Sequence, residues 1–364
     1  MTVIDVPSLS IGLNGRSRRR IERSPVCGCC PCFLLLPALA STDASEKVED
    51  LNLPAGAEGC LGAADGVVPG WMEDPFLTIG YRTRYSFAEL SKSLFMWHNQ
   101  TLNIHTHLWG SVLFLCYAAS DLTAAGSGVA DGGGGGSGFA GVGALGRYLL
   151  SPEPDAEMEA QLWTATIFTF HLSGVFMLGS SALFHLYCSH SARVYEGLLR
   201  LDLCGIAVMF GGSYLPAVAV GFRCFWLFRF LYLLFGIAIL GVGIATGFRV
   251  IPEQYGVRTF IGMGFVSVLP AIHWVIVAPR EKILTFCGLV FGMLGLYGIG
   301  AAFYVTRFPE AYFPRYRRKF SFVGGSHQFW HLFVLLAAVW WHSSMLYYRS
   351  FVLSGEVQCP AATP

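Results

Sequence analysis

Seven long apolar segments constrain the fold of this chain more than any other feature of its sequence. Each approaches or exceeds the roughly 20 residues that a helix needs to cross a bilayer. Charged residues make up 13% of the chain, whereas an ordinary soluble domain carries about 25%. We expect membrane-spanning helices near residues 104–121, 162–187, 201–221, 230–248, 258–278, 283–305 and 327–348. The sequence therefore predicts an all-α membrane protein, a seven-transmembrane helix bundle.

Composition divides the chain into four parts. Residues 1–75 are rich in Gly, Pro, Ser and Ala without a helical or strand period, so we expect a disordered N-terminal tail. Residues 76–103 form a juxtamembrane amphipathic segment, and residues 104–350 form the seven-helix domain. That domain carries a Gly-rich loop at 122–160, and residues 351–364 form a C-terminal tail.

The tail contains a basic run, Arg16–Arg20, followed by a cysteine cluster between Cys27 and Cys32. An S-acylated anchor with a polybasic patch would have this composition. A targeting segment would also combine a charged region with an apolar core. A disordered tail with incidental cysteines is a third interpretation. The sequence leaves all three open.

Positive charge near the segment ends predicts the orientation of the bundle. With a cytoplasmic N-terminus, the inner face would hold twelve Lys and Arg residues and the outer face six. The inner twelve are Arg82, Arg84, Lys92, Arg193, Arg200, Arg249, Arg258, Arg307, Arg315, Arg317, Arg318 and Lys319. Because cytoplasmic loops carry the excess of positive charge, we expect the N-terminus inside and the C-terminus outside.

Four ionisable residues fall at the same end of their apolar segments under that topology. His185 ends the second segment, Asp202 begins the third, and His327 and His331 begin the seventh. Ionisable residues inside a membrane are costly and mark functional sites by default. Their common depth suggests that they form one site.

The residue types at that depth predict zinc. His327 and His331 are spaced i, i+4, which places both imidazoles on one helix face. With His185 they would make three protein ligands and leave the fourth position open, as in catalytic zinc sites. Asp202 could then orient a water molecule and accept its proton as a general base. Ser181, one turn before His185, could bond to the second nitrogen of that histidine or to a reacting carbonyl.

Other histidines have a simpler interpretation. A single histidine in a membrane helix is more often a hydrogen-bonding partner than a metal ligand, and we assign His171, His273 and His342 to that group. We expect His98 and His107 to brace or cap the first segment together with Asn103. The basic run Arg315–Lys319 could contact anionic lipid, although topology-setting charge is its ordinary role.

Several function classes are disfavoured. A net charge of +1 without a dominant basic face argues against a nucleic-acid partner. No Gly-rich phosphate loop, Ser-His-Asp arrangement or dinucleotide fingerprint stands out. The expected partners are the membrane and a lipid or lipid-like ligand in the bundle, in a plasma membrane or endomembrane; the sequence does not identify a protein ligand.

These residues also carry a family resemblance. The chain resembles the progestin and adipoQ receptor (PAQR) and haemolysin III family over about residues 76–350. The matching blocks are Ser181-x-x-Phe-His185, Cys188-Ser-His190-Ser, Leu-Asp202-x-x-Gly205-Ile, Ser213-x-x-Pro216, His98–Gly110, Pro309–Pro314 and Ser326-His327-Gln328-x-x-His331. Seven segments and a complete histidine set are most similar to the adiponectin-receptor branch. His105 and Leu203 depart from the family pattern, which usually has Trp and an aromatic residue there.

The resemblance implies a cytoplasmic N-terminus and Zn²⁺ held by His185, His327 and His331, with Asp202 at the position of the zinc-bound water. It also implies an adiponectin-receptor-like receptor in lipid or metabolic signalling, or a ceramidase-like amide hydrolase activity. The alternatives are a zinc-dependent lipid amidohydrolase without a receptor role and a haemolysin III-type membrane protein.

Overall fold

The structure is a computed structural model that describes residues 68–83, 85–130, 156–277 and 280–353. Within these ranges every regular element is helical. The basic run and the cysteine cluster of the tail lie outside the described residues, as do the glycine run of the loop and the final residues of the C-terminal tail.

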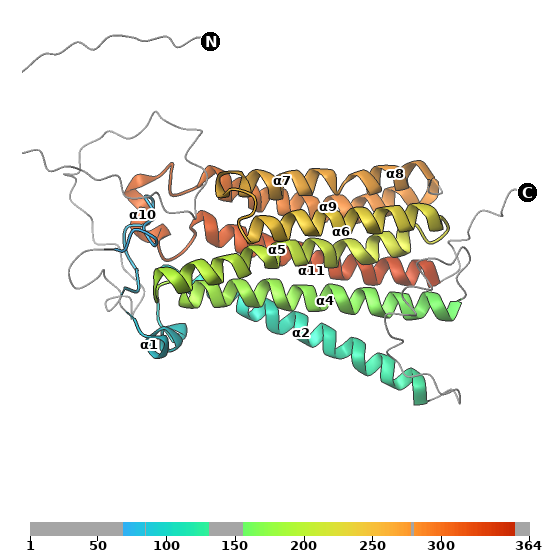
Figure 1. Cartoon of the computed structure of the whole chain (residues 1–364), viewed down its shortest axis with the longest axis horizontal. Helices are drawn as coiled ribbons and strands as arrows, with labels where there is room; N and C mark the ends of the chain where they lie inside the picture. The colour runs from blue at the N-terminus through green and yellow to red at the C-terminus, as the bar shows by residue number, and fades with distance from the viewer. Residues whose placement is uncertain (1–67, 84, 131–155, 278–279, 354–364) are drawn as a thin grey trace, which may run out of the picture.

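Long helices lie side by side along one axis and form the bundle seen in Figure 1. In chain order they are α2 (Thr101–Ala130), α4 (Ala156–Tyr187), α5 (Ala192–Gly221), α6 (Trp226–Gly247), α7 (Gly256–Val266) with α8 (Leu269–Val277), α9 (Arg280–Thr306) and α11 (Ser326–Leu353). Helix α2 lies against α4 and diverges from the bundle toward its own C-terminal end. The predicted all-α membrane bundle is confirmed.

Six helical stretches of the described residues are long and apolar enough to cross a membrane. They are Gln161–Tyr187, Ala192–Ala219, Trp226–Gly247, Glu253–Val277, Phe286–Thr306 and Ser326–Ser350. Helix α2 is a further long helix, of 30 residues, at the position of the first expected segment. Ile276 and Leu284 expose 76% and 86% of their surface, as expected for side chains that face lipid rather than water. The chain is an integral multi-pass membrane protein.

Several boundaries differ from those expected from hydropathy. Helix α5 begins at Ala192 rather than near residue 201, so Asp202 lies inside this helix and does not begin it. The segment expected at 258–278 is divided into α7 and α8 between Val266 and Leu269. Pro270, in the first turn of α8, has no backbone N–H to continue the hydrogen bonding of α7. The first segment, expected at 104–121, continues to Ala130, because a helix need not stop where its apolar stretch ends.

Small residues allow the first helices to pack closely. A Cβ on Gly174 of α4 would lie 2.2 Å from the ring of Phe114 of α2, and one on Gly212 of α5 would lie 2.2 Å from the Ser173 hydroxyl of α4. Phe114 is fully buried in the main core together with Phe170. These contacts place α2, α4 and α5 in fixed register, and the register determines which side chains meet at the bundle end.

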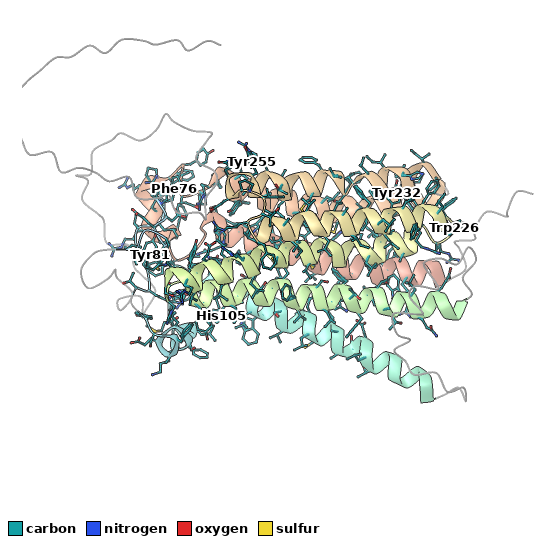
Figure 2. All side chains as sticks on the ribbon, in the orientation of Figure 1. Phe76, Tyr81, His105, Trp226, Tyr232 and Tyr255 are labelled. Carbon is teal, nitrogen blue, oxygen red and sulfur yellow. The ribbon has the colours of Figure 1, made fainter. Side chains whose placement is uncertain are left out.

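One end of the bundle is closed by the segment before α2. This end holds α1 (Phe87–Lys92), α10 (Arg317–Phe320) and residues 68–83, whereas α8 ends at the opposite end. Gly80 has φ +84°, and a Cβ there would lie 2.9 Å from the Asn99 nitrogen. The Asn99 N–H donates to the Gly80 carbonyl at 3.1 Å. In Figure 2, Phe76, Tyr81 and His105 lie at this end, and Trp226 and Tyr232 lie at the other.

Candidate metal centre

The three predicted histidine ligands meet at the closed end of the bundle. His185 lies in the last turn of α4, and His327 and His331 lie in the first two turns of α11. One nitrogen from each lies within 4.8 Å of the others, and among the described residues these three form the group that could hold a metal ion. His185 and His331 are buried, with 4% and 2% exposure.

The spacing of the nitrogens fits a tetrahedral metal. The Nε2 atom of His327 lies 3.4 Å from Nε2 of His185 and 3.2 Å from Nε2 of His331. Nitrogens bound at the usual Zn–N distance around one tetrahedral Zn²⁺ lie roughly 3.3 Å apart. These residues therefore fit zinc by ligand type, by number and by separation.

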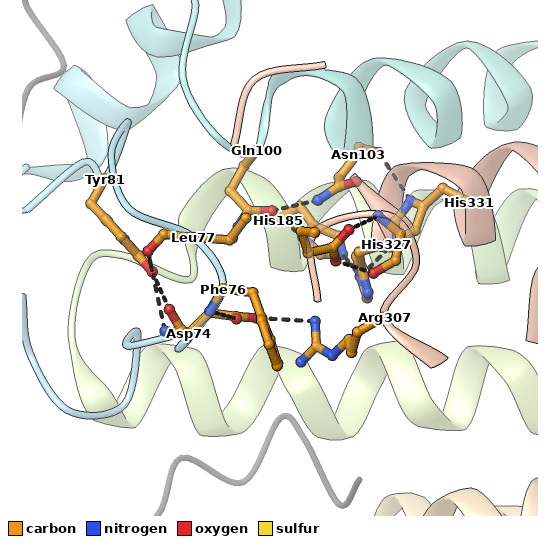
Figure 3. A network of polar contacts seen from close by, with 12 residues as sticks. Asp74, Phe76, Leu77, Tyr81, Gln100, Asn103, His185, Arg307, His327 and His331 are labelled. Atoms are coloured by element: carbon orange, nitrogen blue, oxygen red, sulfur yellow. Dashed lines mark hydrogen bonds and ion pairs between the residues drawn. The ribbon is translucent and has the colours of Figure 1, made fainter. Parts of the chain in front are cut away.

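Hydrogen bonds to the opposite ring nitrogens orient two of the imidazoles. The Nδ1 atom of His185 lies 2.8 Å from Oε1 of Gln100, and Nδ1 of His331 lies 3.2 Å from the carbonyl oxygen of Asn103. Both oxygens can only accept, so each Nδ1 is assigned as the N–H donor. Each Nε2 is then left with a lone pair directed toward the other histidines. Figure 3 shows this convergence.

Gln100 connects two elements around the site. Its Oε1 also accepts from Nδ2 of Asn103 at 2.7 Å, while its backbone N–H donates to Nδ1 of His98 at 3.1 Å. Burial, and after it the charge of Arg82, lowers the pKa of His98 to about 2, so this ring is neutral and can accept. The start of α2 is thereby fixed with the Gln100 amide facing His185.

Residues expected to brace or cap the first segment also contact the candidate site. The ring of His107 stacks on that of His331 at 3.8 Å, and its Nε2 lies 3.3 Å from the His331 carbonyl oxygen. The His98 N–H donates to the Thr101 hydroxyl, at the beginning of α2. The structural role expected for His98, Asn103 and His107 is confirmed, and Asn103 additionally contacts a candidate ligand.

A buried arginine holds the end of α4. Arg82, fully buried, donates from Nη2 to the His185 carbonyl at 2.6 Å and from Nη1 to the Leu186 carbonyl at 2.9 Å. Nη1 also donates to the Ser93 hydroxyl at 2.8 Å. The last carbonyls of a helix have no partner within the helix, so this guanidinium serves as the C-cap of α4. It thereby fixes the backbone that carries His185.

A buried carboxylate holds the start of α11. Oε2 of Glu310 accepts from the Ser326 backbone N–H at 2.9 Å, and Oε1 accepts from the Ser326 hydroxyl. A negative charge is favourable at a helix N-terminus, where N–H groups lack partners. Glu310 is 2% exposed, and it bonds Ser326, the first residue of the helix turn that carries His327.

Asp202 and Ser181 contact each other rather than the histidine nitrogens. The Ser181 hydroxyl and the Asp202 carboxyl are hydrogen bonded. Ser181 is buried, at 2% exposure. The second nitrogen of His185 faces Gln100, so the expected bond from Ser181 to that nitrogen is not the one formed. Asp202 lies outside the compact group of possible metal ligands, which keeps it available for a role beside the metal.

Three residues of this site were not singled out from the sequence. Arg82 was counted only as topology-setting charge, while Gln100 and Glu310 belonged to motifs without an assigned role. Arg82 lies in Tyr81-Arg82-Thr83-Arg84, and no local feature of that stretch separates the buried arginine from its neighbour. No local pattern predicts that Gln100 faces a helix end 85 residues away.

His171, His273 and His342 make hydrogen bonds, as expected from the sequence. His171 lies 2.6 Å from Asp121 and 2.8 Å from His342, and His273 lies 2.8 Å from the Tyr232 hydroxyl. None of them belongs to the candidate ligand group among the described residues.

Comparisons with known proteins agree with the helical membrane fold. The family model described as Haemolysin-III related matches residues 95–342, so the chain belongs to that family. The human progestin and adipoQ receptor family member 3 is 27% identical over 299 residues, covering 78% of this chain and 85% of its own length. The adiponectin receptor protein of Drosophila melanogaster is 32% identical, covering 80% of this chain and 61% of its own length. A heptahelical transmembrane protein of Oryza sativa subsp. japonica, ADIPOR1, is 31% identical, covering 81% and 85%.

Proposed function

We propose that the chain is an adiponectin-receptor-like membrane receptor that binds Zn²⁺ through His185, His327 and His331, with a lipid amide hydrolase activity at that site. The observation that carries the metal is the convergence of three Nε2 atoms at 3.2 and 3.4 Å. The Nε2 lone pairs of His185 and His331 face the same place as Nε2 of His327, which is the arrangement that a bound cation requires, and zinc is the ion that prefers this ligand set.

The receptor part of the proposal is supported by the family. The Drosophila melanogaster relative, 32% identical, is named an adiponectin receptor protein, and the human relative is named a progestin and adipoQ receptor family member. A zinc site that joins α4 to α11 would hold together helices that signalling could rearrange. The ligand of this chain is expected to be lipid-like, because the helices around the site are apolar.

The hydrolase part is supported by the residues beside the histidines. Bound Zn²⁺ would supply a Lewis acid that polarises a carbonyl and activates water. Asp202 would accept a proton from that water, and the Ser181 hydroxyl would hold the Asp202 carboxyl in position. A site of purely structural zinc needs neither a half-buried carboxyl bonded to the helix that carries His185 nor an open fourth position.

Metal content tests the zinc site. We expect about one zinc per purified chain, and substitution of His327 or His331 by Ala should remove most of it, because loss of a ligand lowers affinity by orders of magnitude. His273→Ala is the matched control, since this half-buried histidine lies 2.8 Å from the Tyr232 hydroxyl and is not in the candidate ligand group among the described residues. Stoichiometric zinc in a triple variant of His185, His327 and His331 would refute the site.

Asp202→Asn separates the two activities. The amide keeps the shape and the hydrogen bond to Ser181, but it cannot accept a proton. Ceramide hydrolysis by zinc-loaded protein should fall by about two orders of magnitude or more while zinc content stays near one. If the wild type does not hydrolyse ceramide, and Asp202→Asn keeps its zinc and its signalling, the protein is a receptor with structural zinc. Loss of zinc from Asp202→Asn would make the aspartate a ligand and contradict the proposed arrangement.

A further inference from the structure

The loop between α9 and α11 carries the basic run that the candidate metal centre does not use. Here the chain leaves one membrane-spanning stretch at Thr306 and enters another at Ser326. The loop is therefore held close to the membrane boundary at the closed end of the bundle, where α10 lies in Figure 1.

The side chains of this loop divide between two directions. Arg317 points inward: its Nε donates to the Glu310 carbonyl at 3.0 Å, and its guanidinium lies over the Phe76 ring at 5.1 Å. Arg315 and Lys319 are exposed. The inward arginine fixes the loop to the residue that caps α11, and its neighbours are presented outward.

Exposed aromatic rings lie on the same loop as these cations. Tyr312, Phe313 and Tyr316 are exposed by 56%, 45% and 46%. Tyr and Trp gather at membrane interfaces because their rings are amphipathic. Large exposed aromatics are unfavourable in water, and at this boundary their natural surroundings are lipid headgroups and the first carbons of acyl chains.

Charge on the loop is unbalanced. The residues from Ala311 to Gly325 include four basic and no acidic side chains. Other arginines at this end pair with carboxylates, as Arg307 does with Asp74 at 3.1 Å and Arg249 with Glu196 at 2.8 Å. Among the described residues no carboxylate pairs with Arg318 or Lys319, so the patch has an excess of positive charge for an anionic partner.

We propose that Arg315, Arg318 and Lys319, with Tyr312, Phe313 and Tyr316, form a binding site for the headgroup of an anionic membrane phospholipid. Guanidinium and ammonium groups bind phosphate and carboxylate oxygens, while the rings sit at headgroup depth. We name these six residues the basic–aromatic patch. Its occupant is a lipid of the surrounding membrane, because the loop lies at the membrane boundary and exposed aromatic rings favour the interface.

The patch is connected to the candidate metal centre through a short chain of contacts. Arg317, between Arg315 and Lys319 in sequence, donates to the Glu310 carbonyl, and the Glu310 carboxylate caps α11 one residue before His327. A bound headgroup therefore restrains the loop that positions His327. Lipid composition would in this way affect the stability of the closed end.

Competition between lipids tests the site. Full-length protein is reconstituted in phosphatidylcholine nanodiscs containing about one fifth phosphatidylserine, and the lipids retained after extraction are counted by native mass spectrometry. We expect the wild type to retain phosphatidylserine over phosphatidylcholine. Each neutralised basic residue should lower that preference about fivefold, so Arg315→Gln/Lys319→Gln should lower it more than tenfold.

Two controls keep the result specific. Arg193→Gln removes an exposed charge at the start of α5, at the same end of the bundle but away from the exposed rings, and should leave the preference unchanged. Tyr312→Ser/Phe313→Ser should weaken retention without changing charge. The zinc content of each variant is measured in parallel, so failure of the lipid site is distinguishable from failure of the metal site.

Three results would overturn the proposal. Equal phosphatidylserine preference in the wild type and the double variant would do so, as would an equal loss in Arg193→Gln. Binding of soluble glycerophosphoserine as strongly as the lipid would identify an aqueous anion site instead. If the double variant fails to fold, Lys319→Gln alone, at an exposed position, decides between a fivefold loss and none.

Discussion

The ring orientation of two candidate ligands depends on the hydrogen-bond partner of their second nitrogen. His185 donates to a side-chain amide and His331 to a backbone carbonyl, so the two bonds respond differently to substitution. A carbonyl cannot be removed by changing one residue. The side-chain amide of Gln100 can be removed by substitution, so Gln100 is the residue at which the orientation of a ligand can be tested.

Gln100→Leu should weaken zinc binding by about 10–100-fold, the usual effect of removing a hydrogen bond to a ligating imidazole. Gln100→Glu keeps an oxygen acceptor and should retain most of the affinity. Zinc affinity is measured by competition with a chelator of known strength. Gln254→Leu, an exposed glutamine before α7, is the control. Equal affinities of the Leu and Glu variants would remove Gln100 from the metal site.

At this scale the sequence predicted that the three candidate ligands converge, but it did not predict the contacts of Gln100, Arg82 and Glu310 that support them. The i, i+4 spacing and the depth of His185 are local properties that a helix converts directly into position. The partners of Gln100, Arg82 and Glu310 lie on other elements, and in the cases of Gln100 and Arg82 more than 80 residues away. Only the packed structure determines which long side chain reaches which helix end.

At the scale of helices, a second polar cluster joins α2 to the bundle. Asp121 of α2 lies 2.6 Å from Nδ1 of His171 in α4, whose Nε2 lies 2.8 Å from Nδ1 of His342 in α11. The ring of Tyr117 stacks on His342 at 3.8 Å. His342 follows His331 by eleven residues, roughly 17 Å along a helix, so this cluster and the contacts around the candidate metal centre hold α2 at two separate depths.

Asp121→Ala should therefore destabilise the position of α2 without affecting zinc. Removal of the carboxylate leaves the buried Nδ1 of His171 without its acceptor, at about 1–3 kcal/mol. Thermal unfolding measures the loss, and hydrogen exchange should increase in α2 more than in α9. Asp121→Asn keeps an acceptor oxygen and should lose less. Loss of zinc from Asp121→Ala would indicate that the two clusters are coupled.

The length of the apolar stretches predicted the seven segments. It did not predict the polar contacts that hold α2 against the bundle or the break between α7 and α8. Hydropathy averages over a window, so it does not detect a two-residue interruption at Ser267 and Val268. Asp121 and His171 each look like isolated polar residues in apolar surroundings. Their pairing follows from the packing of Phe114 against Gly174, which aligns α2 with α4.

At the scale of the whole molecule, three sets of polar contacts stabilise the closed end around the candidate metal centre. The segment carrying Asp74 pairs with Arg307, the Arg82 guanidinium caps α4, and the Glu310 carboxylate caps α11. All of them lie at the end that the distribution of Lys and Arg assigns to the cytoplasm. Orientation is a prediction of the charge pattern and has a direct test.

Epitope tags at Thr2 and Pro364 should report opposite sides of the membrane. The N-terminal tag should be detected only after cells are permeabilised, and the C-terminal tag in intact cells if the protein reaches the cell surface, because the inner face holds twelve of eighteen positive charges. For protein in internal membranes, selective permeabilisation of the plasma membrane makes the same distinction. Both tags on one side would contradict an odd number of membrane crossings.

Removal of zinc should loosen this end before the rest of the bundle. A ligand present at about 1,000 times its dissociation constant stabilises the folded state by about 4 kcal/mol, and that contribution is lost when a chelator removes it. The site joins α4 to α11, and α2 contacts both through Gln100 and Asn103. Chelation should therefore lower the unfolding temperature and increase hydrogen exchange in residues 71–107 more than in α6. The triple variant of His185, His327 and His331 should not respond to the chelator. An equal response of wild type and triple variant would mean that the chelator acts elsewhere, and that the histidines converge without holding the metal that stabilises the fold.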